Sequence, residues 1–207
     1  MNSTVKTTSK LNASKHKVNQ FTLKEQIGQG SFGIVKLVFD EHQNNAYAMK
    51  IISKRRLKRK SGFRRPGKQK SPSLIDNIYK EIAFLKKLCH QNIVQLVEVI
   101  DNEADENLYM VYELMLGGEV LELDEEGNAK APLPEHLARK YFLDCLMALE
   151  YMHANNIVHK DIKPSNILLD KANQLAKLAD LGVSEEFDPK SSKISRTTGT
   201  GHNFVNI

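Results

Sequence analysis

The residues best suited to carry out chemistry lie in one short stretch of the chain, from Val158 to Asn166. Within it, Asp161 is followed by Lys163 two positions later and by Asn166 five positions later. At this spacing a carboxylate can accept the proton of an attacking hydroxyl group, an ammonium group can neutralise charge on a phosphoryl group in transfer, and an amide can hold a metal ion. The stretch therefore predicts phosphoryl transfer, with Asp161 as the base.

A glycine-rich segment near the N-terminus offers a second candidate site. Gly28, Gly30 and Gly33 lie between two strand patterns, where glycines let the backbone approach phosphate oxygens and direct amide groups at them. The same spacing marks dinucleotide-binding folds, but those place a helix after the last glycine, whereas here a β-branched strand begins at Ile34. A plain glycine hairpin is the alternative interpretation.

Two charged residues lie inside apolar patterns. Lys50 belongs to the apolar strand 47–52, where a buried ammonium group is costly unless it is paired. Glu81 precedes Ile82 on the apolar face of a predicted helix. An ion pair between Lys50 and Glu81 that holds nucleotide phosphates explains both positions. The alternative is a lysine that reaches solvent at a strand edge and a solvated glutamate.

A further carboxylate ends a strand-like segment. Asp180 follows the strand-like segment 175–179 and precedes a turn at Gly182, which suits a carboxylate that bridges metal ions. An ordinary aspartate in a turn is the alternative.

Apolar periodicity predicts the elements that position these residues. A three-stranded meander is expected over residues 21–39 and 46–52, and a helix is expected over 73–88. Two further strands are expected over 93–100 and 108–114. Beyond Gly118 the period becomes helical, and Pro134 opens a helix whose apolar face consists of Leu137, Tyr141, Cys145, Ala148 and Met152. The predicted class is α+β, with a β-rich small lobe over 21–114, a helical large lobe over 115–200, a disordered tail over 1–20 and a second tail over 201–207.

Composition limits the classes of partner. The chain has 207 residues, of which 41% are hydrophobic, and its net charge of +5 is too small to indicate nucleic acid. Much of the basic excess lies in an insert over residues 54–71. No apolar run is long enough to cross a membrane, and residues 1–20 lack the apolar stretch of a secretory signal. Cys89 and Cys145 lie in helical patterns, which favours a reducing, cytoplasmic setting.

Taken together, these segments resemble the eukaryotic protein kinase family from Phe21 to Thr200. The resemblance implies ATP and Mg²⁺ as cofactors, a protein substrate, and a two-lobe kinase fold. Asp161 would be the catalytic base, and Lys163 would be a second catalytic residue that neutralises charge on the phosphoryl group. Lys163 together with Thr200 indicates the Ser/Thr branch of the family. Asn166 and Asp180 would bind the metal. Lys50 would contact the phosphates and pair with Glu81. The full set of nucleotide-binding positions would be Ile27, Gly28, Gly30, Gly33, Val35, Ala48, Lys50, Tyr112, Glu113, Met115 and Leu168.

A finer resemblance points to the calcium/calmodulin-dependent protein kinase kinases. It rests on the basic segment Gly62 to Pro66, which is similar to an Arg-Pro-rich insert of that family, and on three further segments, 108–114, 161–166 and 182–187. It implies that the substrates are activation loops of other Ser/Thr kinases and that the insert docks substrate. A solvated loop, or a nuclear-localisation-like run over 54–60, is the alternative, so a nuclear location is weighed beside the cytoplasm. Calmodulin would act only through a region beyond this chain.

Three positions depart from the family pattern. Lys160 replaces the usual Arg, which keeps a charge but loses the bidentate fork, so restraint of a phosphorylated loop should weaken. Leu181 replaces the usual Phe. After Thr200, residues 201–207 match nothing in a pattern that elsewhere continues into several helices. We therefore expect an incomplete large lobe with an apolar surface near Tyr141–Met152, and the alternative function is a truncated, inactive fragment that binds ATP or other proteins.

Overall fold

The computed structural model describes residues 17–30, 33–61, 73–124, 126–170 and 174–187. The chain forms two compact units. The first takes in residues up to Tyr79 together with Gln95–Leu114, and the second takes in Lys80–Val94 and the residues from Met115 onward. Among the described residues, no helix is both long and apolar enough to span a bilayer.

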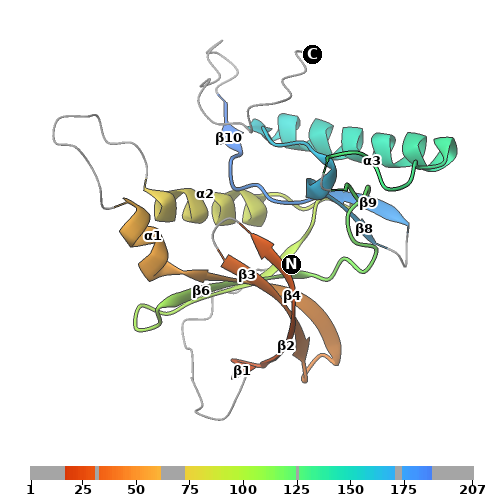
Figure 1. Cartoon of the computed structure of the whole chain (residues 1–207). Helices are drawn as coiled ribbons and strands as arrows, with labels where there is room; N and C mark the ends of the chain where they lie inside the picture. Colours follow the sequence, from red (N-terminus) through yellow and green to blue (C-terminus); the bar gives the residue numbers. More distant parts are fainter. Residues whose placement is uncertain (1–16, 31–32, 62–72, 125, 171–173, 188–207) are drawn as a thin grey trace. The chain divides into compact units, whose positions relative to one another are not determined.

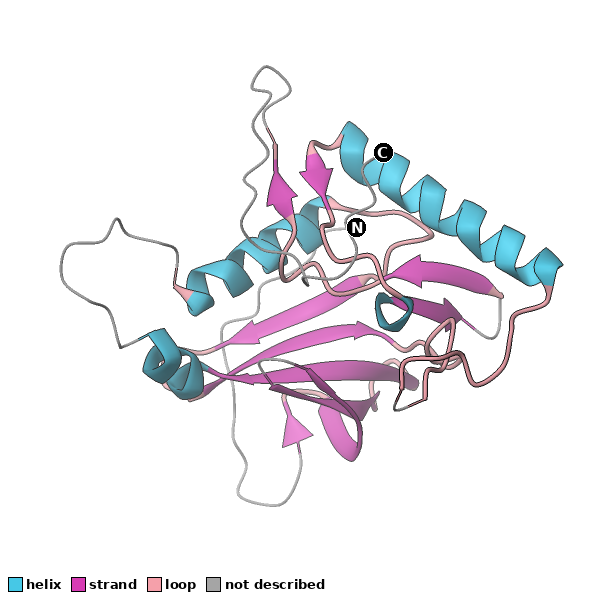
Figure 2. Cartoon of the chain, turned by 45° about the horizontal axis from the view of Figure 1, so that its top comes forward, coloured by secondary structure: helices cyan, strands magenta, loops and turns pink. Residues whose placement is uncertain are grey.

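The first unit contains a curled, antiparallel sheet of six strands in the order β1-β2-β3-β4-β6-β5 (Figure 1). Its strands are β1 (Lys17–Val18), β2 (Phe21–Gly30), β3 (Gly33–Asp40), β4 (Asn45–Ser53), β5 (Leu96–Asp101) and β6 (Asn107–Glu113). The α+β class predicted from the sequence is confirmed, because the strands and the helices form separate segments of the chain, drawn in magenta and cyan in Figure 2. Lys17–Val18, which we expected within a disordered tail, pair with Thr22 and Phe21.

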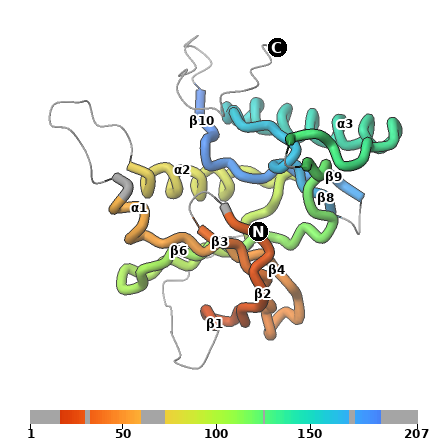
Figure 3. Tube along the Cα trace, in the orientation of Figure 1, coloured from red at the N-terminus to blue at the C-terminus, as the bar shows by residue number. Residues whose placement is uncertain are grey.

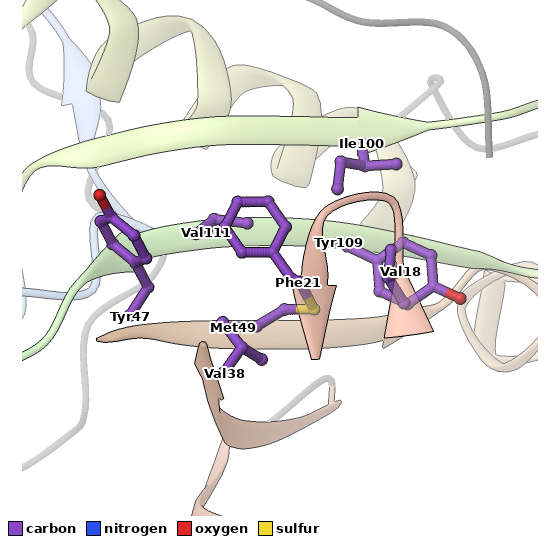
Figure 4. Packing of buried hydrophobic residues seen from close by; sticks show 8 residues of the cluster. All are labelled: Val18, Phe21, Val38, Tyr47, Met49, Ile100, Tyr109 and Val111. Atoms are coloured by element: carbon purple, nitrogen blue, oxygen red, sulfur yellow. The ribbon is translucent and has the colours of Figure 1, made fainter. Parts of the chain in front are cut away.

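One face of this sheet is packed with apolar side chains. Figure 4 shows the cluster, in which Phe21 and Tyr47 meet edge to face with their ring centroids 6.0 Å apart; the members are Val18, Phe21, Val38, Tyr47, Met49, Ile100, Tyr109 and Val111. Each such side chain contributes roughly 1.5–3 kcal/mol on full burial. Because side chains alternate along a strand, the neighbours of Met49, which are Ala48 and Lys50, point to the opposite face.

A short helix, α1 (Lys54–Ser61), directly follows β4 and was not expected from the sequence. The basic run had suggested a docking insert, a solvated loop or a nuclear-localisation-like run, but lysine and arginine are good helix formers. Ser53 caps the helix by accepting a hydrogen bond from the Arg56 amide at 3.4 Å. Leu57, only 1% exposed, anchors the helix to the unit. The Arg-Pro-containing part of the insert, residues 62–71, lies outside the described residues.

Helix α2 (Leu74–Lys87) agrees with the predicted helix to within one residue at each end. Ser73 and Asp76 cap its start reciprocally: the Ser73 amide donates to Asp76 Oδ2 at 2.8 Å, and the Asp76 amide donates to Ser73 Oγ at 3.2 Å. Tyr79 then ties this end of the helix to β5, because its hydroxyl donates to Asp101 Oδ2 at 2.7 Å. Lys54 of α1 donates to the other oxygen of the same carboxylate at 3.0 Å.

The second unit is built on α3 (Glu135–Ala154) and two small antiparallel ladders. The ladders pair β7 (Ile157–Val158) with β10 (Glu185–Glu186) and β8 (Ile167–Asp170) with β9 (Leu175–Leu178). Figure 3 follows the chain from α3 into β7. The expected face of α3 is buried at Tyr141, Cys145, Ala148 and Met152, and the helix also buries Asp144, whose Oδ2 accepts the Ala176 amide at 2.9 Å. Its opposite side exposes apolar side chains at Phe142, Leu143, Leu146 and Met147.

The segment that enters the second unit is fixed against β8. Gly117 donates its amide to the Leu169 carbonyl at 2.8 Å, and the Leu169 amide donates to the Gly118 carbonyl at 2.8 Å. A Cβ atom on Gly117 would lie 2.6 Å from both the Cβ and the carbonyl oxygen of Leu169. Only glycine therefore permits this approach between two backbones.

Candidate active site

Asp161 is held by the side chain of Asn166. A 3₁₀ turn, η1 (Pro164–Asn166), brings the amide back toward the aspartate, and Pro164 suits its first position because a proline ring fixes φ near the helical value. Asn166 Nδ2 donates to the Asp161 carbonyl at 2.8 Å and to Asp161 Oδ2 at 3.0 Å. Asn166 is buried and the Asp161 side chain is 12% exposed, so the carboxylate has one defined orientation with access to solvent.

Lys163 lies beside the same carboxylate. Its ammonium group is 2.8 Å from Asp161 Oδ2, and the lysine side chain is 40% exposed. The stretch that the sequence singled out therefore brings its carboxylate, ammonium and amide groups together. A cation beside the carboxylate favours its charged form, which is the form that can accept a proton.

His159 joins Asp161 to the segment that carries Asp180. The Asp161 amide donates to His159 Nδ1 at 3.3 Å, and His159 Nε2 lies 3.1 Å from the Ala179 carbonyl. With Nδ1 as acceptor, Nε2 carries the proton and donates to Ala179. Burial lowers the pKa of His159, so the ring is neutral near pH 7 and both hydrogen bonds are satisfied.

Asp180 lies next to the Asn166 backbone. The Ala179 amide donates to the Asn166 carbonyl at 2.9 Å, and Asp180 itself is exposed, with φ at 59°. Gly182 lies close to two carboxylates, because a Cβ on it would come within a tight 3.2 Å of Asp180 Oδ1 and an ordinary 3.5 Å of Glu81 Oε2. Glu81 is 2% exposed on α2.

The donor set of Asn166 and Asp180 fits a hard divalent cation. The amide nitrogen of Asn166 is directed at Asp161, which leaves its oxygen as the atom for a metal, and Asp180 adds a carboxylate. Among the described residues, no three or more His, Cys, Asp or Glu side chains cluster into a metal site of their own. A magnesium ion bound through two protein oxygens, with phosphates and water completing its shell, needs no such cluster.

The candidate nucleotide residues of the first unit lie in register across the sheet. Gly28 pairs with Val35, Val35 with Lys50, and Lys50 with Met110, so these residues share one face of β2, β3, β4 and β6. Ala48 lies two positions from Lys50 on that face. Gly30 and Gly33 pair at the end of the β2–β3 hairpin. At Gly33 a Cβ would come within 1.9 Å of the Ile51 carbonyl oxygen, so the strand crossing requires glycine.

The remaining nucleotide candidates are divided between the two units. Ile27 is exposed on β2, and Tyr112 pairs with Ala48 and Leu96 within the sheet. The Glu113 amide donates to the Gln95 carbonyl at 3.1 Å, so a contact of Glu113 with a purine would have to use its carbonyl. Met115 and Leu168 belong to the second unit, where Leu168 pairs with Glu119 and Lys177. Because Lys50 lies in the first unit and Glu81 in the second, their expected ion pair stays a prediction.

Sequence reasoning missed one residue beside the candidate base. Glu185 on β10 lies 2.8 Å from the ammonium group of Lys160, and the lysine side chain is 9% exposed. Lys160 was recognised only as a departure from the family pattern. The approach of Glu185 depends on the pairing of two-residue strands, which carry no periodicity for sequence reasoning to detect.

Comparison with known proteins agrees with this arrangement. A family model for the protein kinase domain matches residues 21–204, four residues beyond Thr200. A calcium/calmodulin-dependent protein kinase kinase of Caenorhabditis elegans is 46% identical over 193 residues, which cover 88% of this chain and 35% of that protein. The human serine/threonine-protein kinase STK11 is 35% identical over 184 residues, which cover 89% of this chain and 39% of that protein. The Schizosaccharomyces pombe serine/threonine-protein kinase ssp1 is 39% identical over 167 residues, which cover 81% of this chain and 24% of that protein.

The chain thus spans between about a quarter and two fifths of the length of these relatives. Over that span, the family model covers the glycine-rich hairpin, the strand of Lys50 and the whole stretch from Asp161 to Asp180. This chain belongs to the protein kinase family.

Proposed function

We propose that the chain carries the phosphoryl-transfer residues of a Ser/Thr protein kinase, which moves the γ-phosphoryl group of ATP to a protein hydroxyl group. The observation that carries the proposal is the fixed carboxylate of Asp161, bonded by Asn166 and paired with Lys163. Membership of the family implies ATP and a divalent metal ion in general. The hard oxygen donors of Asn166 and Asp180 favour Mg²⁺.

In this mechanism Asp161 accepts the proton of the attacking hydroxyl group. Its geometry is suited to the task, because Oδ2 is held by Asn166 and Lys163 while the side chain keeps some exposure to solvent. Lys163 lies close enough to neutralise charge on the transferred group. A magnesium ion bound by Asn166 and Asp180 would neutralise phosphate charge.

Nucleotide binding is assigned to the face of the first sheet that carries Gly28, Val35, Ala48 and Lys50. The apolar side chains of Val35 and Ala48 suit the flat faces of a purine ring, and Lys50 supplies a positive charge for phosphate. The glycines of the β2–β3 hairpin let backbone amides approach the same phosphates. We propose Ile27, Tyr112, Glu113, Met115 and Leu168 as the other nucleotide contacts.

We further propose that the protein substrate is the activation loop of another Ser/Thr kinase. The support is the 46% identity to a relative whose name describes a kinase of kinases. The same name refers to calcium and calmodulin, which makes calmodulin a candidate partner. The basic insert proposed to dock the substrate lies over residues 54–71, of which 62–71 fall outside the described residues.

The test measures transfer of radiolabelled phosphate from Mg-ATP to a peptide with the sequence of a Ser/Thr kinase activation loop. Asp161→Asn should reduce transfer about 10²- to 10⁴-fold, the usual contribution of a general base. Lys50→Met should also reduce the rate, because misplaced phosphates lose alignment. Asp124→Asn is the matched control, since Asp124 lies in an exposed turn where its side chain accepts hydrogen bonds from the amides of Glu126 and Asn128, and it should leave transfer unchanged.

A second function is supported by the apolar side of α3, where Phe142 is 63% and Leu143 is 52% exposed. Such a surface fits a fragment that binds nucleotide or other proteins without transferring phosphate. Melting with and without Mg-ATP reports nucleotide binding in either case, because a ligand at 100 times its Kd raises stability by about 2.7 kcal/mol whether or not transfer follows, and the transfer assay then separates the two functions. A melting shift with transfer no higher than that of Asp161→Asn would favour the second function.

A further inference from the structure

Strand β9, which leads toward Asp180, is hydrogen-bonded along both of its edges. On one edge it pairs with β8, where Leu169 lies opposite Ala176. Leu169 directs its carbonyl and its amide to Gly117 and Gly118 on the far side of β8. In an antiparallel ladder such a residue exchanges no hydrogen bonds with the residue opposite it. The backbone amide and carbonyl of Ala176 therefore face the outer edge of β9.

Two buried side chains bind these outer groups of Ala176. Its amide donates to Asp144 Oδ2 on α3 at 2.9 Å, and its carbonyl accepts from Asn92 Nδ2 at 2.9 Å. Asp144 is 5% exposed and Asn92 is fully buried, so solvent has little access to either contact. Lys140, one turn before Asp144 on α3, lies 3.5 Å from Asp144 Oδ2 and donates to the carbonyl of Gln174, directly before β9. Two side chains of α3 thus hold the start of β9.

The pairing of β8 with β9 alone specifies the register of β9 only weakly. Each of the two strands has only four residues. A slip of one residue would turn every side chain and every backbone amide of β9 to the opposite side. The Ala176 amide would then point away from Asp144. Because this buried carboxylate accepts the amide only in the observed register, it selects that register.

The register of β9 decides where Asp180 lies relative to Asn166. Ala179 directly follows β9, and its amide donates to the Asn166 carbonyl at 2.9 Å. The carbonyl of Ala179 lies 3.1 Å from His159 Nε2. Both contacts require β9 to end where it does, and Asp180 is the next residue of the chain. A change of register would therefore separate the two candidate metal ligands.

We propose that Asp144 is a positioning residue for the metal ion. With Lys140 beside it, Asp144 accepts the Ala176 amide, fixes the register of β9 and so keeps Asp180 next to Asn166. It touches neither the metal nor the phosphates itself. This inference rests on the proposed function, in which Asn166 and Asp180 bind magnesium. It predicts that the acceptor oxygen of residue 144 matters more than its charge.

The first test does not depend on activity. It measures hydrogen exchange of the Ala179 amide by NMR in the full chain, at a temperature where the variants are folded. Asp144→Leu removes the acceptor and should speed this exchange at least about tenfold, whereas Asp144→Asn keeps an acceptor oxygen and should stay within about threefold. Glu150→Leu is the matched control, because Glu150 is an exposed acid on the same helix. Equal exchange in Asp144→Leu and Glu150→Leu, or in Asp144→Leu and Asp144→Asn, would overturn the proposal.

A milder pair of variants keeps the test decisive if Asp144→Leu fails to fold. Lys140→Met removes the contact with Gln174 from a side chain that is 39% exposed, and it should speed exchange of the Ala179 amide at least about threefold. Arg139→Met is its control, because Arg139 pairs with Glu135 at the surface, where the two side chains are 74% and 87% exposed. The absence of any difference between these two variants would overturn the role of the α3 side chains.

The second test is a magnesium titration of the initial rate. A ligand that binds one of two states loses apparent affinity in proportion to the population of that state, so Asp144→Leu should raise the half-maximal magnesium concentration at least about fivefold. Saturating magnesium should restore the rate to within about twofold, because the metal selects the observed register. A low rate with an unchanged half-maximal concentration would overturn the link to the metal. If the unaltered chain transfers no more phosphate than Asp161→Asn, the proposed function fails, and amide exchange alone then decides whether Asp144 fixes β9.

Discussion

Asn166 bonds Asp161 twice through a single amide nitrogen, once at the backbone carbonyl and once at the carboxylate. The residue expected to bind the metal therefore also fixes the residue expected to take the proton. One side chain couples the two halves of the proposed chemistry.

We predict that Asn166→Ala lowers phosphate transfer by about 10- to 100-fold, because a hydrogen bond to a charged group contributes roughly 1.5–3 kcal/mol. Transfer should remain low at all magnesium concentrations, since the orientation of Asp161 is lost together with a metal ligand. A magnesium titration of the initial rate checks this. Full recovery at high magnesium would mean that Asn166 binds the metal and does not position Asp161.

The glycines of the β2–β3 hairpin should differ in their tolerance of a methyl group. Gly33→Ala places a Cβ 1.9 Å from the Ile51 carbonyl oxygen and must displace β3 or β4, at a cost of about 1–3 kcal/mol or more. Gly28→Ala is the control, because its Cβ would meet Val35 at an ordinary 3.5 Å. Urea unfolding of both variants measures the difference, and equal losses would contradict the predicted clash.

The buried imidazole of His159 should make stability fall in mild acid. Its pKa is lowered in the folded chain, so the unfolded chain takes up a proton first as the pH falls below about 6.5. The contribution of His159 to the free energy of unfolding is complete above that pH. It is lost progressively as the pH falls below it, toward the lowered pKa of the folded chain. Urea unfolding between pH 5 and 8 measures this slope. His159→Gln should reduce the slope, while His153→Gln, at an exposed position on α3, should leave it unchanged.

Tyr79 should be identifiable in an alkaline titration. Its hydrogen bond to Asp101 raises the pKa of the phenol to about 12, so the folded chain holds this proton more tightly than the unfolded chain. The resulting stability is present below pH 10 and is lost as the pH rises toward 12. Burial also raises the pKa of Tyr109, so phenolate absorbance should show a late-titrating component that loses one tyrosine in Tyr79→Phe. That variant should lose about 0.5–1.5 kcal/mol of stability, toward the low end because Tyr79 is 43% exposed.

The sequence predicted most of the described fold because its signals were local. Strand alternation placed β3 and β4, and the spacing of apolar residues placed α2 and the buried face of α3. The grouping of Asp161, Lys163 and Asn166 was also predictable, because all three lie within the short stretch 161–166, which ends in a 3₁₀ turn.

Long-range contacts were not predictable in the same way. Helix α1 depends on one anchor, Leu57, within a run whose charges alone suggested a loop. The ion pair of Lys160 with Glu185 joins positions 25 residues apart, and nothing in either local pattern indicates the other. The roles of the individual site residues remain predictions, because they concern chemistry with a nucleotide and a substrate.

Gly117 illustrates how a site can be vulnerable at a residue that takes no part in its chemistry. Every other amino acid adds at least a Cβ, and that atom alone would lie 2.6 Å from Leu169. The obstacle is a backbone, so a smaller or more flexible replacement brings no relief. Among inherited variants of this chain, all missense changes at codon 117 should therefore fall into one severity class. Each would displace β8, the strand that begins directly after Asn166 and carries Leu168.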